Sequence, residues 1–249
     1  MSVLLYEKRD QIAYITLNRP DSLNAYNDEL IERLGDAFAD YRDDSSLLVA
    51  IITGEGRAFS VGADLKEMDS KGESAGTRML RTPTTEKVWK PIIAAIDGYA
   101  LAGGFVIALE CDIRIATEHS QLGDVTTRMG AWGPLEIYNK MPFGEALYMH
   151  LTSTPLTAEE AYRMGLVHKV LPDRESLLKE AVSIAEQIKL AAPLALQAMK
   201  KLAYTSLMET GDEVDILSRA LVQEVSQSED AKEGPRAFAQ KRKPVWKMR

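Results

Sequence analysis

Two glycine-containing turns hold the residues of this chain whose types and spacing could do chemistry. The first is RAFSVGADLKEM, residues 57–68, and the second is DGYALAGGFVIAL, residues 97–109. Gly62 permits backbone angles that a side chain would exclude, and the N–H of Ala63 lacks an intrahelical partner if this residue opens a helix. Gly103 lets a ligand approach the backbone and leaves another free N–H at the start of a helix. Two such donors that face one point would stabilise an oxyanion.

The same glycines also have a purely structural explanation. A tight turn from a strand into a helix needs glycine for close packing, and spacing alone does not separate this explanation from a chemical one. The strand–turn–helix pattern occurs twice, over residues 51–66 and 93–109, with glycine at each turn. Each turn can therefore direct backbone N–H groups at a shared point.

The elements that must position the two turns alternate between strand and helix in the first two thirds of the chain. LLVAIIT at 47–53 and IIAAI at 92–96 are continuous apolar runs, which are typical of strands covered on both faces. A hairpin is expected over 3–17 and a helix over 27–41, where apolar residues repeat with helical spacing. The remaining strands expected in this part are 113–116 and 121–123.

The last third of the chain is predicted to be mainly helical. One helix should begin at Thr157, which forms the pattern of a capping box with Glu160. The other expected helices span residues 144–151, 174–190, 193–209 and 211–226, and a short strand is expected at 167–171. The sequence thus predicts an α/β chain with a core over residues 1–190 and a helical C-terminal region over 191–249.

The composition is that of an ordinary globular protein. The chain has 249 residues, a net charge of −7 and one cysteine, Cys111, which its apolar neighbours predict to be buried. The negative charge argues against nonspecific binding to nucleic acid, and a single cysteine excludes an internal disulfide. Every apolar run is shorter than the ~18 residues that a membrane span needs. We therefore expect a cytoplasmic protein that contacts neither nucleic acid nor membrane.

Several motifs together resemble those of the crotonase (enoyl-CoA hydratase/isomerase) family. FSVGADLKEM looks like the segment that binds the CoA thioester, and PIIAAIDGYALAGG is similar to the family's second glycine segment. LNRPDSLNA resembles the start of the CoA-binding region, and LTAEEAYRMGLVHKVLP and EDAKEGPRAFAQKRKPVWK resemble two later patterns. The motifs occur in order from about Tyr6 to Lys247, so the resemblance covers nearly the whole chain.

The resemblance implies a spiral core of stacked ββα turns and a helical C-terminal trimerisation region. It also implies an oxyanion hole made by the N–H groups of Ala63 and Gly103, an acyl-CoA substrate and an enolate intermediate. The residues that would contact CoA are Leu23, Ala25, Ser60, Asp64, Leu65, Phe238 and Lys241. Phe238 and Lys241 would reach the nucleotide, either within their own subunit or across a subunit boundary. No separate cofactor is implied, because coenzyme A enters as part of the substrate.

The chain departs from the family at both hydratase glutamates. Hydratases of this family use two glutamates, one as a base and one as an acid, to ionise a water molecule. Counting from Gly103, the first glutamate position holds Val106, and in the run LGDVT the second holds Thr126. Neither side chain can replace a carboxylate. Residues 129–142 also lack the family's glycine-rich loop. The acyl pocket therefore differs in the region that usually determines which reaction a member of the family catalyses.

Other carboxylates are candidates for moving the proton. Glu136 lies in the altered segment and Asp124 lies beside the missing second glutamate. Each also has a structural interpretation, as a surface helix residue and as a turn-capping residue respectively. Glu110 lies one helical turn after Val106 on the same face and also fits a structural ion pair.

The remaining polar residues of this region give weaker signals. Tyr138 and Arg128 could line the pocket or bind a substrate group, but a single residue of either type is also found in ordinary packing or on a surface. His119, His150 and His168 match no ligand or triad spacing. No metal site is predicted.

Three functions fit these observations. The first is an acyl-CoA lyase or isomerase with a relocated acid/base, Glu136 or Asp124. The second is a hydrolase or decarboxylase of the same family, because loss of CO₂ itself generates an enolate. The third is an acyl-CoA-binding subunit with little catalysis. The amphipathic helices after residue 174 would expose apolar surface in a monomer, so we expect a homotrimer or a hexamer.

Overall fold

The computed structural model describes residues 2–73, 79–131, 137–208, 212–242 and 244–249. The chain begins with strands β1 (Leu4–Arg9) and β2 (Ile12–Leu17), which pair antiparallel as predicted. Asp10 and Gln11 connect them with φ angles of 53° and 65°. Because the turn takes only two residues, both strands extend up to it.

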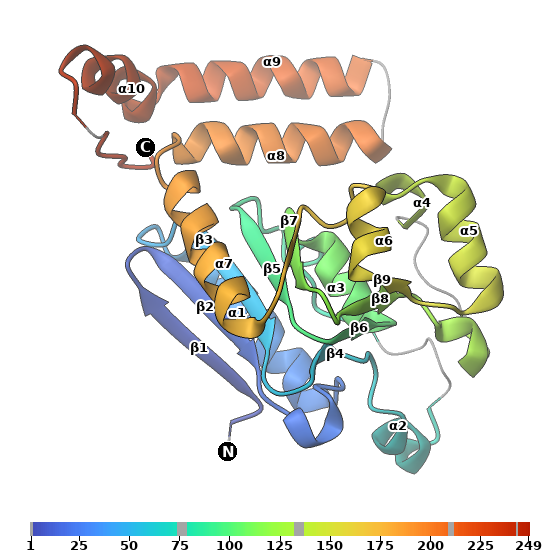
Figure 1. Ribbon diagram of the computed structural model, residues 1–249. Coiled ribbons are helices and arrows are strands. Elements are labelled where there is room, and N and C mark those ends of the chain that lie inside the picture. Colours follow the sequence, from blue (N-terminus) through green and yellow to red (C-terminus); the bar gives the residue numbers. More distant parts are fainter. Residues whose placement is uncertain (1, 74–78, 132–136, 209–211, 243) are drawn as a thin grey trace.

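Six strands form the larger sheet in the order β1-β2-β3-β5-β7-β10 (Figure 1). The last four are β3 (Val49–Gly54), β5 (Ile92–Ile96), β7 (Ile113–Thr117) and β10 (Lys169–Leu171), all parallel to β2. β3 and β5 are buried along their whole length, which confirms the prediction of strands covered on both faces.

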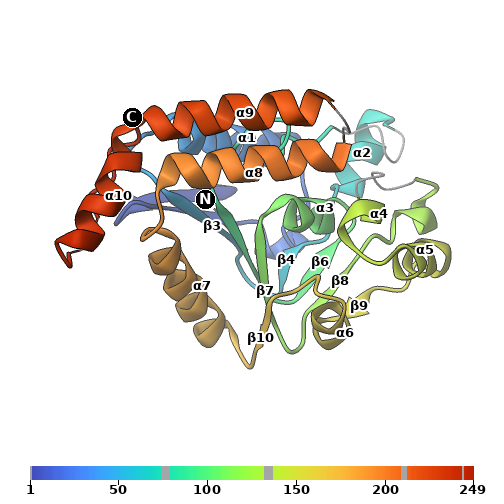
Figure 2. The same cartoon turned by 90° about the horizontal axis from the view of Figure 1, so that it is seen from above.

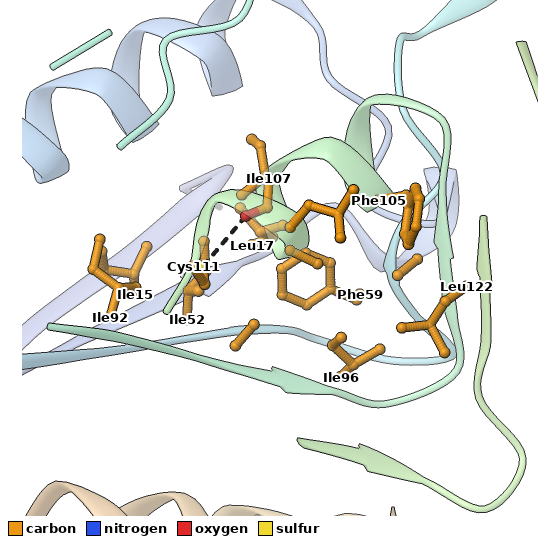
Figure 3. Close-up of a cluster of buried hydrophobic side chains, with 14 of the residues drawn as sticks. Ile15, Leu17, Ile52, Phe59, Ile92, Ile96, Phe105, Ile107, Cys111 and Leu122 are labelled. Carbon is orange, nitrogen blue, oxygen red and sulfur yellow. Dashed lines mark hydrogen bonds between the residues drawn. The ribbon is translucent and has the colours of Figure 1, made fainter. Parts of the chain in front are cut away.

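The two faces of this sheet pack against different partners. Helix α7 (Arg174–Ile188) covers one face, where its Leu177 and Ala181 belong to the same apolar cluster as Ile12 (Figure 2). Side chains of alternate strand residues point to the other face, which packs against α1 (Asp28–Asp43) and α3 (Gly103–Glu110). Figure 3 shows part of this second cluster.

Cys111 lies within this second cluster and is buried, as predicted. Its thiol donates a hydrogen bond of 3.3 Å to the carbonyl oxygen of Ile107, one turn earlier in α3 (Figure 3). The thiol therefore acts as a small core side chain with a satisfied donor.

A smaller sheet carries the two glycine turns. It consists of β4 (Ala58–Ser60), β6 (Tyr99–Leu101), β8 (Gln121–Gly123) and β9 (Leu156–Thr157), in that order. The chain runs β3-β4-α2, where α2 spans Leu65–Lys71, and then β5-β6-α3, which are two successive ββα turns. Because β4 and β6 pair in parallel, the turns that follow them emerge at the same end of the smaller sheet. This arrangement confirms the predicted fold class.

The chain after β8 is mainly helical, as predicted. Besides α7, its described helices are η2 (Thr126–Met129), α4 (Ile137–Lys140), α5 (Phe143–Thr152), α6 (Ala158–Arg163), α8 (Pro193–Met208), α9 (Asp212–Gln227) and α10 (Glu229–Ala239). The capping box of Thr157 and Glu160 is present at α6, whereas α10 was not expected. α8 and α9 run side by side (Figures 1 and 2). None of the described helices is long and apolar enough to cross a membrane.

Candidate active site

A cavity of about 1100 Å³ lies where the two glycine turns meet. Ala63 from the first turn and Gly103 from the second both line it. The turns are in backbone contact, because a Cβ atom on Gly62 would lie 2.9 Å from the amide nitrogen of Gly103. Gly62 also has a φ of 92°, so both the available space and the backbone angle require glycine there.

Tyr26 holds the first turn by two backbone hydrogen bonds. Its N–H donates to the carbonyl oxygen of Gly62 at 2.7 Å, and its carbonyl oxygen accepts from the N–H of Asp64 at 2.9 Å. The buried hydroxyl of Ser60 lies beneath the turn and accepts from the N–H of Gly62 at 3.2 Å. Ala63 lies between the two bonded residues, and within the described part of the chain its own N–H has no hydrogen-bond acceptor.

The second turn adopts a strained backbone. Ala102 has a φ of 50° and a ψ of −124°, a combination that residues with side chains rarely adopt. Gly104 approaches β4 so closely that a Cβ atom would lie 2.2 Å from the carbonyl oxygen of Ser60. Gly103 is the first residue of α3, and no described residue provides an acceptor for its N–H. Each turn thus contributes to the same cavity one N–H that has no acceptor among the residues the structure describes.

Three of the predicted CoA contacts form one end of the cavity, next to the short helix η1 (Pro20–Ser22). Ala25, Asp64 and Leu65 line it there, and Leu65 remains 49% exposed. The Arg19 guanidinium pairs with the Asp64 carboxylate at 2.9 Å and also donates to the Ala25 carbonyl oxygen. Burial opposes the ionisation of Asp64, but Arg19 and the N–H groups at the start of α2 outweigh it and lower the pKa of this carboxyl.

Of the other predicted CoA contacts, Leu23, Ser60 and Lys241 are not among the described residues that line the cavity. The carbonyl oxygen of Leu23 accepts from the Val61 N–H at 3.2 Å, so Leu23 supports the first turn from behind, as does the buried Ser60. Lys241 follows α10 and is exposed, and the side chain of Phe238 lies outside the described part of the chain. Contact of these last two with a nucleotide stays a prediction.

The two positions at which the sequence motifs predict a loss of the hydratase glutamates lie at the cavity. Val106 on α3 and Thr126 at the start of η2 both line it. The Thr126 hydroxyl oxygen is buried and has no hydrogen-bond partner among the described residues. The cavity wall therefore carries an apolar side chain and a hydroxyl at these positions, where a pair of carboxylates would ionise water.

Asp124 also lies at the cavity wall, although its side chain has no exposed surface, and it forms the end of a hydrogen-bonded chain of three side chains. Its Oδ2 lies 3.2 Å from Nε2 of His150, and Nδ1 of His150 lies 2.9 Å from the Tyr138 hydroxyl. The other carboxylate oxygen, Oδ1, accepts from the N–H of Thr126 at 2.9 Å. Asp124 and His150 are both buried. Sequence spacing gave no role to His150, because 26 residues separate it from its carboxylate partner.

Two further charged residues line the same cavity. The carboxylate of Glu110 accepts a hydrogen bond of 3.0 Å from the N–H of Thr84, and within the described part of the chain it has no ion pair. Arg128 likewise lines the cavity without a carboxylate within 4.0 Å among the described residues. Glu136 and Trp132 lie outside the described residues. No described group of three or more His, Cys, Asp or Glu side chains is arranged to hold a metal ion.

The chain is similar over nearly its whole length to proteins of one family. The model of the enoyl-CoA hydratase/isomerase family matches residues 7–249. (E)-Benzylidenesuccinyl-CoA hydratase from Thauera aromatica is 36% identical over 250 residues, which cover 97% of each chain. 2,3-Dehydroadipyl-CoA hydratase from Escherichia coli K12 is 35% identical over 100% of both chains. An enoyl-CoA hydratase from Mycobacterium tuberculosis H37Rv has a structure with a TM-score of 0.90, 35% identity and 99% coverage of both chains.

Proposed function

Because the chain belongs to the enoyl-CoA hydratase/isomerase family of acyl-CoA enzymes, we propose that it is a lyase or isomerase that acts through a thioester enolate. The observation that carries the proposal is the pair of N–H groups, of Ala63 and Gly103, that line one cavity and have no acceptor among the described residues. A thioester carbonyl oxygen placed there would accept both hydrogen bonds. Removing one donor of such a pair typically costs roughly 3–4 kcal/mol of transition-state stabilisation.

The backbone contact between the turns supports this use of the two donors. A donor stabilises developing charge best when it is already in place, because no free energy is then spent on reorganisation during the reaction. Gly62 and Gly103 are packed too closely for either turn to shift alone. The two N–H groups therefore keep one separation in the free and the occupied cavity.

Asp124 is the described carboxylate that we assign to proton transfer. In the isomerase reaction its carboxylate takes a proton from Cα of a 3-enoyl thioester, and the C–H electrons move onto the carbonyl oxygen. The same carboxyl then returns the proton to Cγ. In the lyase reaction the proton goes instead to a departing β-hydroxyl group, which leaves as water. Either reaction needs one acid/base group, in agreement with Val106 and Thr126 at the glutamate positions. Glu136 remains the alternative from the sequence.

We assign the CoA moiety to the end of the cavity formed by Ala25, Asp64 and Leu65. Arg19 and Lys66 line this end and provide positive charge for phosphate groups. Leu23 and Ser60 would act indirectly by supporting the first turn. Phe238 and Lys241 would reach the nucleotide of a neighbouring subunit in a homotrimer or hexamer.

Deuterium exchange at Cα of butyryl-CoA tests the enolate directly, without knowledge of the natural acyl group. Enolate formation in D₂O replaces the α-protons, and NMR follows their loss. We expect catalysed exchange by the wild-type protein and a fall of about 10²-fold or more in Asp124→Asn, in the range of general acid–base contributions. Tight binding of butyryl-CoA without exchange would reject the proposed function and favour a binding subunit.

One observation favours a second candidate, a decarboxylase. Arg128 lines the cavity without a described carboxylate partner, so it is available to bind a carboxylate on the acyl group. Loss of that carboxylate as CO₂ would leave its electron pair as the same enolate. Release of CO₂ from malonyl- or methylmalonyl-CoA, together with no conversion of 3-enoyl or 3-hydroxyacyl thioesters, would favour this candidate.

A further inference from the structure

We propose that His150 is a positioning residue for Asp124, and that Tyr138, His150 and Asp124 form one directed hydrogen-bond chain that ends at the acyl cavity. The inference rests on the proposed function, because it concerns the group that moves the proton. The observation behind it is geometric: two consecutive side-chain contacts, of 2.9 and 3.2 Å, join Tyr138 of α4, His150 of α5 and Asp124, which lies between β8 and η2.

One assignment of hydrogens satisfies the whole chain. An ionised carboxylate only accepts, so Nε2 of His150 must carry the hydrogen that bonds Oδ2 of Asp124. In the neutral imidazole, Nδ1 is then an acceptor, and the Tyr138 hydroxyl donates to it. The Thr126 N–H donates to the remaining oxygen, Oδ1. Every donor in the chain therefore points toward the Asp124 carboxylate.

The surroundings fix the orientation of both partners. The Thr127 hydroxyl in η2 donates to the carbonyl oxygen of His150 at 2.9 Å, which ties α5 to the segment that carries Asp124. The N–H of Asp124 points at the sulfur of Met149, 3.4 Å away. In the described part of the chain His150 is the only Lys, Arg or His side chain with a nitrogen within 4.0 Å of the Asp124 carboxylate. A buried carboxylate with one ionisable partner depends on that partner for its orientation.

The arrangement follows the logic of a triad in which one side chain orients the next. A base must lie within hydrogen-bond reach of the proton that it removes, and a third group holds the base in that geometry. Here Asp124 lies at the cavity wall with a side chain that is 0% exposed, His150 is 7% exposed, and the Tyr138 hydroxyl contacts the other nitrogen of the imidazole ring. The ring of Tyr138 also packs against His150, with centroids 5.3 Å apart.

A pair of substitutions separates positioning from packing. His150→Gln keeps an N–H donor near the place of Nε2, whereas His150→Leu keeps the volume but removes the donor. We expect His150→Leu to lower kcat for α-proton exchange of butyryl-CoA by about 10-fold or more while KM changes by less than about 2-fold. His150→Gln should recover most of that loss, and Tyr138→Phe should cost less than His150→Leu.

The chain offers a matched control in His119, whose Nε2 lies 3.0 Å from Oδ1 of Asp97. Neither residue of this second His–Asp pair lines the cavity. His119→Leu and His119→Gln should therefore leave kcat and KM unchanged. Thermal melts of all variants establish that the protein is folded, and if His150→Leu does not fold, Tyr138→Phe and His150→Gln carry the test.

The outcomes distinguish this inference from the proposed function. Wild-type kcat in His150→Leu, or equal losses in His150→Leu and His150→Gln, would overturn the positioning role while leaving the enolate chemistry intact. Undiminished exchange in Asp124→Asn would reject Asp124 as the base and the chain with it. Absence of exchange in the wild-type protein would reject the function itself.

Discussion

Gly62 and Gly103 bring the two glycine turns into contact, because a Cβ atom on Gly62 would lie 2.9 Å from the Gly103 amide nitrogen. This contact links two segments that are about forty residues apart and that follow parallel strands of the smaller sheet. The separation of the Ala63 and Gly103 N–H groups is therefore set by strand pairing and not by a mobile loop. A substitution at Gly62 should disturb that separation more than it disturbs the fold.

The first prediction concerns Gly62→Ala. The new methyl group would press on the Gly103 amide, and φ would remain at the unfavourable value of 92°. We expect the free energy of unfolding to fall by about 2–3 kcal/mol and α-proton exchange to fall about 10²-fold or more. Gly72→Ala is the control, because φ is 66° there but a Cβ atom would meet nothing within 4 Å. It should lose about 1 kcal/mol and no activity, and equal losses of activity in both variants would contradict the argument.

The second prediction concerns the strained Ala102. Its φ of 50° and ψ of −124° are readily adopted only by glycine, and such strain costs of order 1–3 kcal/mol. Ala102→Gly should relieve this strain, but the greater conformational entropy of glycine in the unfolded chain offsets part of the gain. The net free energy of unfolding should rise by about 1 kcal/mol. Ala108→Gly, in the interior of the same helix, should instead lower it by about 1 kcal/mol or more. Chemical denaturation measures both, and a destabilised Ala102→Gly would show that the turn is not strained.

Much of the fold was predictable because its strongest elements are specified locally. The buried strands β3 and β5 appear as continuous apolar runs, and the capping box of Thr157 and Glu160 indicates the start of α6. The two glycine turns were also visible, since their backbone geometry excludes other residues at Gly62. The helix α10 was missed because its Gly and Pro residues interrupt the helical pattern.

The acid/base region could not be worked out in the same way, because its contacts depend on tertiary packing. Asp124 follows β8, whereas His150 lies near the end of α5, and only the packing of α5 against η2 brings them within 3.2 Å. No spacing along the sequence encodes that contact. Glu110 was left open between proton transfer and a structural ion pair; the residue lines the cavity, and its carboxylate accepts from the backbone N–H of Thr84.

The third prediction concerns Cys111, the single cysteine of the chain. Burial, with a smaller effect of the neighbouring Asp112 charge, raises the pKa of its thiol to about 12. The native protein should therefore not react with a thiol reagent at pH 8, whereas the protein in guanidinium should react fully. The thiolate is favoured in the unfolded chain, so stability should be unaffected below the unfolded pKa of about 8.5 and decline as pH rises from there toward 12. Rapid labelling of the native protein would contradict this.

The fourth prediction is that the chain assembles as a trimer or hexamer. Its C-terminal helices expose apolar side chains that a monomer would leave in water. These are Met199, Leu207, Ile216 and Val222. Light scattering should give three or six times the chain mass of 27.6 kDa.

Charge placed on this surface should prevent assembly, because burying Ile or Val contributes about 1.5–3 kcal/mol per residue. Ile216 and Val222 are 61% and 67% exposed, and the double variant Ile216→Asp, Val222→Asp should shift the mass to that of a single chain. Leu151→Asp on α5, at a site that is 77% exposed, is the control and should leave the mass unchanged. A monomeric wild-type protein at micromolar concentration would reject the prediction.

The fifth prediction concerns Arg19, which joins the loop before α1 to the start of α2. It pairs with Asp64 at 2.9 Å and donates to the Ala25 carbonyl oxygen, with both charged side chains largely buried at the cavity. Arg19→Gln removes a positive charge and loosens two segments that we assign to CoA. The Kd of CoA should rise about 10-fold, which calorimetry measures, and the free energy of unfolding should fall by about 1–2 kcal/mol.

Arg174 provides the control for Arg19, because it makes a similar set of contacts away from the cavity. It donates to the Gly54 carbonyl oxygen at 2.8 Å and pairs with Glu55 at 3.0 Å. Arg174→Gln should lose stability without a change in the Kd of CoA. The lowered pKa of Asp64 adds a test by pH, because the pair exists only while the carboxylate is ionised. Its stabilisation is complete above the unfolded pKa of about 3.9 and is lost as pH falls through the lower, folded pKa. The stability difference between wild type and Arg19→Gln should therefore shrink below about pH 4, and a constant difference there would exclude the ion pair as its cause.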